Sequence, residues 1–304
     1  MSSGEAVIDL LALLWAPFLM CLVLTGIHAY LGIHVLAREV VFVDIALAQI
    51  AALGATGAFL VGYDMDSPVS YFFGLGATLL GALVLACTRT RERHVSQEAV
   101  IGVVYAVSAA GAVLLMANAP HGAEHLRSML VGNIITVSGR EVAQVALLYA
   151  AIGVLHWLCR RPFFLISTDP EAAFRQGWRV RRWDFIFYAS FGLVVTSSVR
   201  IAGVLLVFAY LIVPALAGTA LGVSVGSRLL IGWGFGTLVS VVGMAASATF
   251  DLPTGATVVC VFGLALLVGW AMARIFGWMP RAASRMSAGA IRRDGLTERW
   301  RVKP

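Results

Sequence analysis

Eight long stretches without a formal charge recur along this chain of 304 residues. They occupy residues 10–30, 45–63, 68–88, 99–120, 142–159, 201–226, 229–250 and 252–273. An α-helix rises about 1.5 Å per residue, so roughly 18–20 apolar residues cross the hydrocarbon core of a bilayer. A ninth run, residues 185–199, is shorter than that. The pattern therefore predicts an all-α polytopic membrane bundle of about eight or nine transmembrane helices.

The charged residues support this prediction and orient the helices. Only 12% of the residues are charged, whereas a soluble domain carries about a quarter. Lysine and arginine collect in cytoplasmic loops of membrane proteins. Of the 22 basic residues, 19 fall in loops that we place on one side: 31–43, 88–98, 160–184, 227–228 and the tail from Arg274. Only Arg127, Arg140 and Arg200 fall on the other side. We therefore expect the amino terminus outside and the carboxyl terminus in the cytoplasm.

Several enzyme signatures are missing from the sequence. It has no GxxxxGK[ST] loop to hold nucleotide phosphates, and its one lysine is Lys303. It also has no HExxH or GxSxG motif. We therefore expect no enzyme active site and no ATPase site in this polypeptide.

The 160–184 loop carries the signals of a short, capped helix. Asp169 suits the N-cap, Pro170 the first helical position and Glu171 the positive end of the helix dipole. Gly177 suits the left-handed residue that ends a helix. The sequence thus predicts a two-turn cytoplasmic helix between two membrane spans.

Six sequence segments then follow in a recognisable order. They are residues 41–49 (VFVDIALAQ), 97–102 (QEAVIG), 130–133 (LVGN), 169–177 (DPEAAFRQG), 202–215 (AGVLL through VPA) and 250–255 (FDLPTG). Over roughly residues 20–273 this series resembles the zinc and manganese (ABC-3 type) permease family of bacterial metal ABC importers. That family shares a D-x-x-x-A-x-x-x-G coupling loop, matched here by Asp169, Ala173 and Gly177.

The resemblance implies a transport subunit. Residues 1–280 would form the permease domain in the inner (plasma) membrane, and 281–304 a basic cytoplasmic tail that faces lipid headgroups and not nucleic acid. The permease would work as a homodimer. A cytoplasmic ABC ATPase would use the ATP and contact residues 169–177, and an extracytoplasmic metal-binding protein would deliver zinc or manganese. No cofactor would be bound permanently.

The second helix departs from the family pattern at its ion site. The resemblance implies that Asp44 and a histidine four residues later hold the ion in the membrane, but Ala48 stands at that position and Gln49 follows it. Five residues turn a straight helix by about 140°, so Asp44 and Gln49 would point to different faces. Either a bulge realigns them, or Asp44 is not part of a two-residue site. Asp44 remains the strongest candidate, because a carboxylate is costly in an apolar span.

A second candidate metal site lies in the outer loop before the fifth membrane helix. His121, Glu124 and His125 have a spacing that, on a helix, places both imidazoles on one face beside the carboxylate. His28 and His34 flank the cytoplasmic end of the first helix, where they could receive a released ion. Isolated histidines at a membrane interface are more often structural, so we leave His28, His34, His94 and His156 out of the site.

Two other functions fit parts of the sequence. An iron-chelate ABC permease needs a wide cavity and no protein ligands to the metal. An ion-coupled secondary transporter needs membrane carboxylates and often an internal repeat, whereas the spans contain only Asp44 and no clear repeat.

Overall fold

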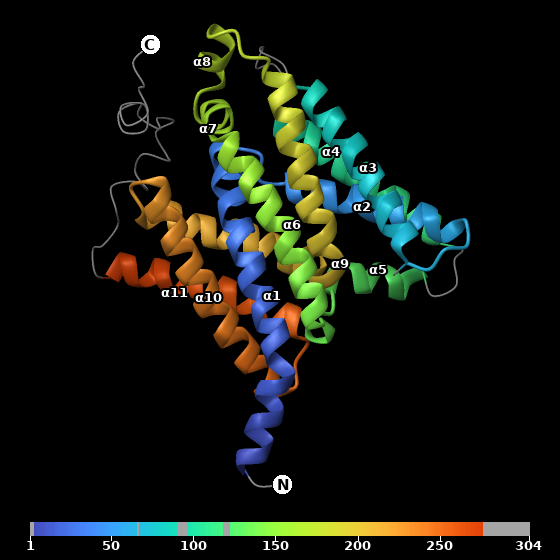
Figure 1. Ribbon diagram of the computed structural model, residues 1–304, viewed down its shortest axis with the longest axis vertical. Coiled ribbons are helices and arrows are strands. Elements are labelled where there is room, and N and C mark those ends of the chain that lie inside the picture. Colours follow the sequence, from blue (N-terminus) through green and yellow to red (C-terminus); the bar gives the residue numbers. More distant parts are fainter. Residues whose placement is uncertain (1–2, 66, 90–95, 118–121, 276–304) are drawn as a thin grey trace.

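The computed structural model describes the backbone of residues 3–65, 67–89, 96–117 and 122–275 (Figure 1). These residues form helices and no strand. In chain order the elements are α1 (Ser3–Arg38), α2 (Val43–Leu60), α3 (Pro68–Cys87), α4 (Gln97–Met116), α5 (Gly122–Val131), η1 (Ile134–Thr136), α6 (Gly139–Leu158), α7 (Arg160–Thr168), α8 (Pro170–Arg175), α9 (Val180–Leu221), α10 (Val225–Phe250) and α11 (Thr254–Ile275). The basic tail, 281–304, lies outside the described residues.

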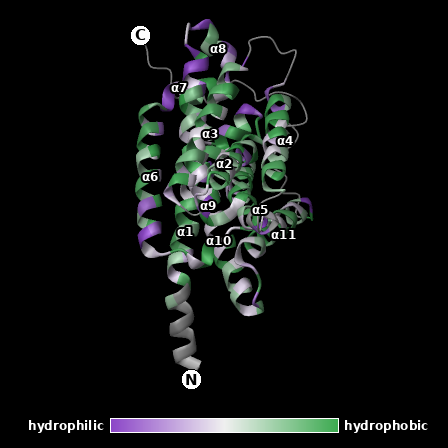
Figure 2. Ribbon diagram, turned by 90° about the vertical axis from the view of Figure 1, so that its right-hand side faces the viewer, coloured by the Kyte–Doolittle hydropathy of each residue, from purple (hydrophilic) through white to green (hydrophobic). Residues whose placement is uncertain are grey.

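Eight of the described helices are long and apolar enough to cross a membrane. They are α1, α2, α3, α4, α6, α9, α10 and α11. Most of the ribbon of these helices has the colour of hydrophobic residues, and hydrophilic residues gather around α7 and α8 (Figure 2). The prediction of an all-α membrane bundle is confirmed.

The longest helix, α9, contains both the short ninth run and the run that follows it. It has 42 residues, and Gly203 inside it has non-helical backbone angles of φ 76° and ψ 159°. A straight helix of that length would be far longer than a bilayer core is thick. The break at Gly203 therefore divides α9 into two segments, three residues beyond the division that Arg200 indicates in the sequence.

The loop prediction for 31–43 is wrong for most of its length. Helix α1 continues to Arg38, and both His34 and Arg38 are buried inside the bundle. Polar partners on α7 and α9 make this possible, because they provide hydrogen bonds for the charged side chain far from water.

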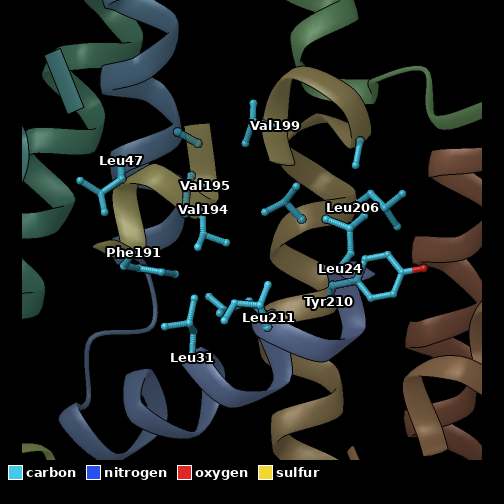
Figure 3. Packing of buried hydrophobic residues seen from close by; sticks show 14 of the residues in the cluster. Leu24, Leu31, Leu47, Phe191, Val194, Val195, Val199, Leu206, Tyr210 and Leu211 are labelled. Atoms are coloured by element: carbon cyan, nitrogen blue, oxygen red, sulfur yellow. The ribbon is translucent and has the colours of Figure 1, made fainter. Parts of the chain in front are cut away.

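Helix α9 lies at the centre of the bundle, in contact with α1, α2, α3, α5, α10 and α11. Figure 3 shows the packing: Leu24 and Leu31 of α1 and Leu47 of α2 lie against the buried side chains of α9, among them Phe191, Leu206 and Tyr210. Between helices that lie in lipid, such contacts stabilise the bundle by close van der Waals packing. This packing fixes the position of α9 relative to α1 and α2, the two helices that carry the buried polar groups described below.

Candidate functional site

A cavity of about 530 Å³ opens between α2, α3, α5, α6 and α9. Its polar lining includes Ser70, Tyr71, Asn133, Thr136, Glu141 and Arg200. Three small residues of α2, Ala51, Ala52 and Ala55, form part of its wall. The cavity lies beside the loop between α2 and α3, since Met65 also lines it.

Asp44 lies on the same face of α2 as two residues that line this cavity. Ala51 and Ala55 follow it by seven and eleven residues, which at about 100° per residue places each of them within about 20° of Asp44 around the helix. The Asp44 side chain is buried, with 1% of the residue exposed, and its Oδ1 has no hydrogen-bond partner in the described part of the chain. Asp44 therefore combines deep burial with an unsatisfied oxygen, roughly 10 Å along the helix from Ala51.

Gln49 occupies another face of α2. The helix runs without interruption from Val43 to Leu60, so no bulge realigns Gln49 with Asp44. Gln49 is half-buried. The structure does not bring the amide and the carboxylate together.

A histidine that the sequence analysis assigned a structural role lies inside the bundle. His28 of α1 is fully buried. Its Nδ1 lies 2.8 Å from the Leu24 carbonyl oxygen, so Nδ1 carries the proton and donates it. Its Nε2, which then keeps a lone pair, lies 3.2 Å from Ser198 Oγ of α9. A backbone carbonyl that fixes the tautomer in this way is typical of imidazoles that bind metals.

Tyr149 of α6 completes this polar group. Its hydroxyl forms a close hydrogen bond with Ser198 Oγ, and its ring lies edge-on to His28 with centroids 6.1 Å apart. Helix α2, which carries the buried Asp44, packs against α9, which carries Ser198. We name His28, Asp44, Tyr149 and Ser198 the polar centre. Its members come from α1, α2, α6 and α9, so sequence spacing alone could not group them. The sequence offers one sign of such a site, because Tyr149 and Ser198 are polar residues inside apolar runs.

Hydroxyl groups connect the polar centre with the cavity. The Tyr71 hydroxyl, which lines the cavity, lies 2.9 Å from Ser197 Oγ, the neighbour of Ser198. Thr196, also on the cavity wall, lies 3.1 Å from Thr78 through their side-chain oxygens. Helix α9 thus carries polar side chains at three consecutive positions, Thr196 on the cavity wall, Ser197 bonded to Tyr71, and Ser198 in the polar centre.

The cavity also holds one negative and one positive side chain. Glu141 accepts hydrogen bonds from the Ser138 backbone nitrogen (2.9 Å) and hydroxyl (2.8 Å), as part of the capping box that begins α6. The Arg200 guanidinium lies 5.6 Å from the centre of the Tyr71 ring. The formal charge contributed by these two residues is zero.

The outer-loop metal site stays a prediction. Glu124 is exposed on α5, His121 lies outside the described residues, and His125 is described only by its backbone. Among the residues that were searched, which are the described ones, no group of three or more histidine, cysteine, aspartate or glutamate side chains is placed to hold a metal ion.

The capped helix of the 160–184 loop is present as α8. Asp169 Oδ1 accepts a hydrogen bond of 2.9 Å from the Ala172 backbone nitrogen, and Pro170 is the first helical residue. Gly177 has a φ of +76°, the left-handed conformation expected there. Ala173 is fully buried in a small cluster with Ile166 and Val180, whereas Glu171 and Arg175 are exposed and lie 3.8 Å apart. The preceding helix, α7, was not predicted.

Three of the six ordered sequence segments meet at the break in α9. The Asn133 backbone nitrogen donates a 3.1 Å hydrogen bond to the Ile201 carbonyl oxygen. A Cβ atom on Gly255 would lie 2.7 Å from the Val131 carbonyl oxygen. Segments 130–133, 202–203 and 250–255 therefore converge at one edge of the cavity, which Gly132 and Asn133 line.

Comparisons with known proteins agree with this architecture. The manganese import system permease protein ScaB of Streptococcus parasanguinis is 23% identical over 244 residues, which cover 80% of this chain and 84% of ScaB. A Haemophilus influenzae protein named "probable iron transport system membrane protein" is 25% identical over 258 residues, 84% of this chain and 92% of that protein. The solved structure of PsaBC from Streptococcus pneumoniae in complex with Fab matches with a TM-score of 0.71 at 21% identity, covering 87% of this chain and 94% of that chain.

The family assignment rests on a match that covers most of the sequence. Residues 11–273 match the ABC 3 transport family. This range contains all eight candidate membrane spans of the described residues, apart from the last two residues of α11. The chain is therefore a multi-pass membrane protein that belongs to the ABC 3 transport family.

Proposed function

We propose that this chain is the permease subunit of an ABC importer that moves a divalent transition metal, manganese or zinc, across the inner membrane. The observation that carries the proposal is Asp44, a buried carboxylate with an unsatisfied oxygen on the α2 face that also carries Ala51 and Ala55 of the cavity wall. Leaving a charge buried without a partner costs several kcal/mol. A cation that passes through the site would offset this cost.

The chemistry of the polar centre suits such an ion. It offers one carboxylate, one imidazole lone pair and two hydroxyl groups, a mixed oxygen and nitrogen set. Carboxylates suit manganese, and imidazole suits zinc, iron and nickel. The relatives support the same class, because one is named for manganese import and another for iron transport.

The family and the charge pattern support a direction of transport and a set of partners. We infer that the cavity faces outside, where an extracytoplasmic metal-binding protein releases the ion. Helices α7 and α8 lie at the opposite end of the molecule from the amino terminus (Figure 1). They would face the cytoplasm and contact an ABC ATPase subunit through α8, and two copies of the permease would enclose the path.

A second candidate function is the import of a metal chelate. It is favoured by the cavity volume of about 530 Å³ and by Arg200, since a guanidinium on the wall would repel a free cation and attract an anionic chelate. Asp44 opposes it, because a buried carboxylate would repel that anion.

Uptake measurements with the purified complex would separate the two functions. The permease, its co-purifying ATPase and its binding protein would be placed in liposomes, with ATP supplied on the ATPase side. Free Mn²⁺ or Zn²⁺ should accumulate and depend on Asp44. Accumulation of a ferric chelate but of neither free ion would contradict the proposal.

A further inference from the structure

Ser167 is the hydrogen-bonding centre of a buried network that the ion path does not use. It is the last residue but one of α7, two positions before the N-cap of α8. Its hydroxyl donates to the Phe163 carbonyl oxygen at 2.7 Å and accepts from Arg38 Nε at 2.8 Å. His34 Nδ1 lies 2.9 Å from the same oxygen, and since the Ser167 proton is already donated, His34 donates as well.

Arg38 extends this network to α9. Its Nη1 lies 2.7 Å from Asp184 Oδ1, and both side chains are fully buried. The guanidinium also lies 3.9 Å from the centre of the Phe187 ring. Arg89, which follows α3, reaches the other carboxylate oxygen of Asp184 at 3.2 Å. One network therefore connects α1, α7 and α9 with the residue that follows α3.

The geometry leaves Arg38 little freedom. Its guanidinium is planar and its donors point in fixed directions, so binding Ser167 and Asp184 at the same time restricts how the three side chains can be arranged. Because the network is buried, separating a member from its partners would leave a polar or charged group without compensation. We expect α1, α7 and α9 to move together at this end of the bundle.

The helices joined in this way carry the polar centre. His28 lies ten residues before Arg38 on α1, and Ser198 lies fourteen residues after Asp184 on α9. Only Asp169 separates α7 from α8. A displacement of α8 therefore has a short covalent route to Ser167 and a hydrogen-bonded route from there to α1 and α9.

We propose that Ser167 is a positioning residue that transmits movement of α8 to the helices that carry the polar centre. The proposal rests on the proposed contact of α8 with an ATPase. Ser167 itself would contact neither the ion nor the ATPase. Its hydroxyl keeps Arg38 bound to α7. When the ATPase closes and moves α8, α1 and α9 therefore move with it.

Thr168 provides a matched control for Ser167. It is the next residue, it is exposed, and its hydroxyl bonds within its own helix, to the Phe164 carbonyl oxygen at 2.8 Å. Ser167→Ala and Thr168→Ala each remove one hydroxyl from the end of α7, but only the first removes the connection to Arg38 and His34. Ser167→Thr keeps a hydroxyl at the central position.

The three variants would be compared with the unaltered permease in liposomes that contain the whole complex. Three quantities are measured: the ATPase retained on the tagged permease, phosphate release, and uptake of radioactive Mn²⁺. Ser167→Ala should retain the ATPase and hydrolyse ATP, while the Mn²⁺ imported per ATP falls about tenfold. Thr168→Ala should match the unaltered protein, and Ser167→Thr should recover most of the loss.

Each alternative result has a distinct meaning. Unchanged Mn²⁺ per ATP in Ser167→Ala would overturn the proposal. An equal fall in uptake and hydrolysis, or a fall in bound ATPase, would also overturn it, because it would indicate a purely structural role. If the unaltered complex imported no metal or retained no ATPase, the proposed function itself would fail, which is a different outcome.

Discussion

Gly132 and Gly203 contact each other through their backbones, and both have positive φ angles, +67° and +76°. A Cβ atom on Gly132 would lie 2.3 Å from the Gly203 nitrogen, and one on Gly203 would lie 2.4 Å from the Gly132 nitrogen. Neither site can hold a larger residue without movement of the backbone. The contact joins the end of α5 to the break in α9 and so fixes one edge of the cavity.

Replacing Gly203 by alanine should destabilise the protein. The new Cβ would clash with the backbone of Val131 and Gly132, and alanine disfavours the left-handed region. We expect a loss of about 2–4 kcal/mol in the free energy of unfolding. Thermal unfolding in detergent would measure it. Gly263→Ala is the control, because a Cβ there meets nothing within 4 Å; equal stability of the two variants would contradict the contact.

The sequence predicted those features that depend on local patterns. Run lengths predicted the membrane helices, and the capping residues around Asp169 predicted α8 with its terminating Gly177. Both signals depend on residues close together in the chain. The sequence located the break in α9 only roughly. The charge of Arg200 separates the two apolar runs, whereas the residue with non-helical backbone angles is Gly203, three positions later.

Features that depend on distant partners were missed. The apolar pattern predicts that the first helix ends at residue 30, near His28. The helix α1 continues to Arg38 because Asp184, which lies 146 residues further along the chain, balances the arginine charge. The place of His28 in the polar centre was missed for the same reason, since its partner Ser198 is 170 residues away in the sequence. No spacing rule could have connected these residues, so the polar centre was represented in the sequence analysis by Asp44 alone.

Asp44→Asn should abolish most of the metal uptake without loss of expression. The amide keeps the shape of the side chain but removes the charge that attracts the cation, and we expect a decrease of at least about tenfold. Gln49→Ala should have a smaller effect, because Gln49 lies on another face of α2. Uptake of Mn²⁺ and Zn²⁺ over a range of concentrations would measure both variants.

An exposed carboxylate provides the control for Asp44. Asp64 lies in the loop between α2 and α3, and Asp64→Asn removes the same charge outside the helices. It should leave uptake unchanged. Normal uptake in Asp44→Asn would exclude this carboxylate from the ion path.

His28→Ala should raise the KM for Mn²⁺ by about tenfold, because it removes the imidazole lone pair of the polar centre. His156→Ala is a matched control. His156 is also a buried histidine, and its Nε2 lies 2.8 Å from Ser190 Oγ, outside the polar centre. Transport kinetics in liposomes would compare them. If both variants changed the KM equally, the effect would come from lost packing and not from a lost ligand.

The orientation of the chain can be tested by cysteine labelling. In a background without the four native cysteines, Tyr63→Cys should react with a membrane-impermeant reagent added to intact cells, because we place the α2–α3 loop outside. Arg179→Cys should react only after the membrane is opened. Both positions are exposed, so access to the reagent depends on the side of the membrane. Labelling of Arg179→Cys in intact cells would reverse the proposed topology.

Reversing the charge of Glu171 should abolish uptake while the permease remains in the membrane. Glu171 is exposed on α8, and its pair with Arg175 is solvent-accessible, so the substitution costs the permease little stability. The introduced positive charge would, however, face the ATPase surface that the carboxylate of Glu171 contacts, and would weaken that contact. Glu171→Arg should therefore lose co-purifying ATPase and uptake together, whereas Arg161→Glu on the exposed side of α7 should lose neither. Full ATPase retention and normal uptake in Glu171→Arg would remove α8 from the contact.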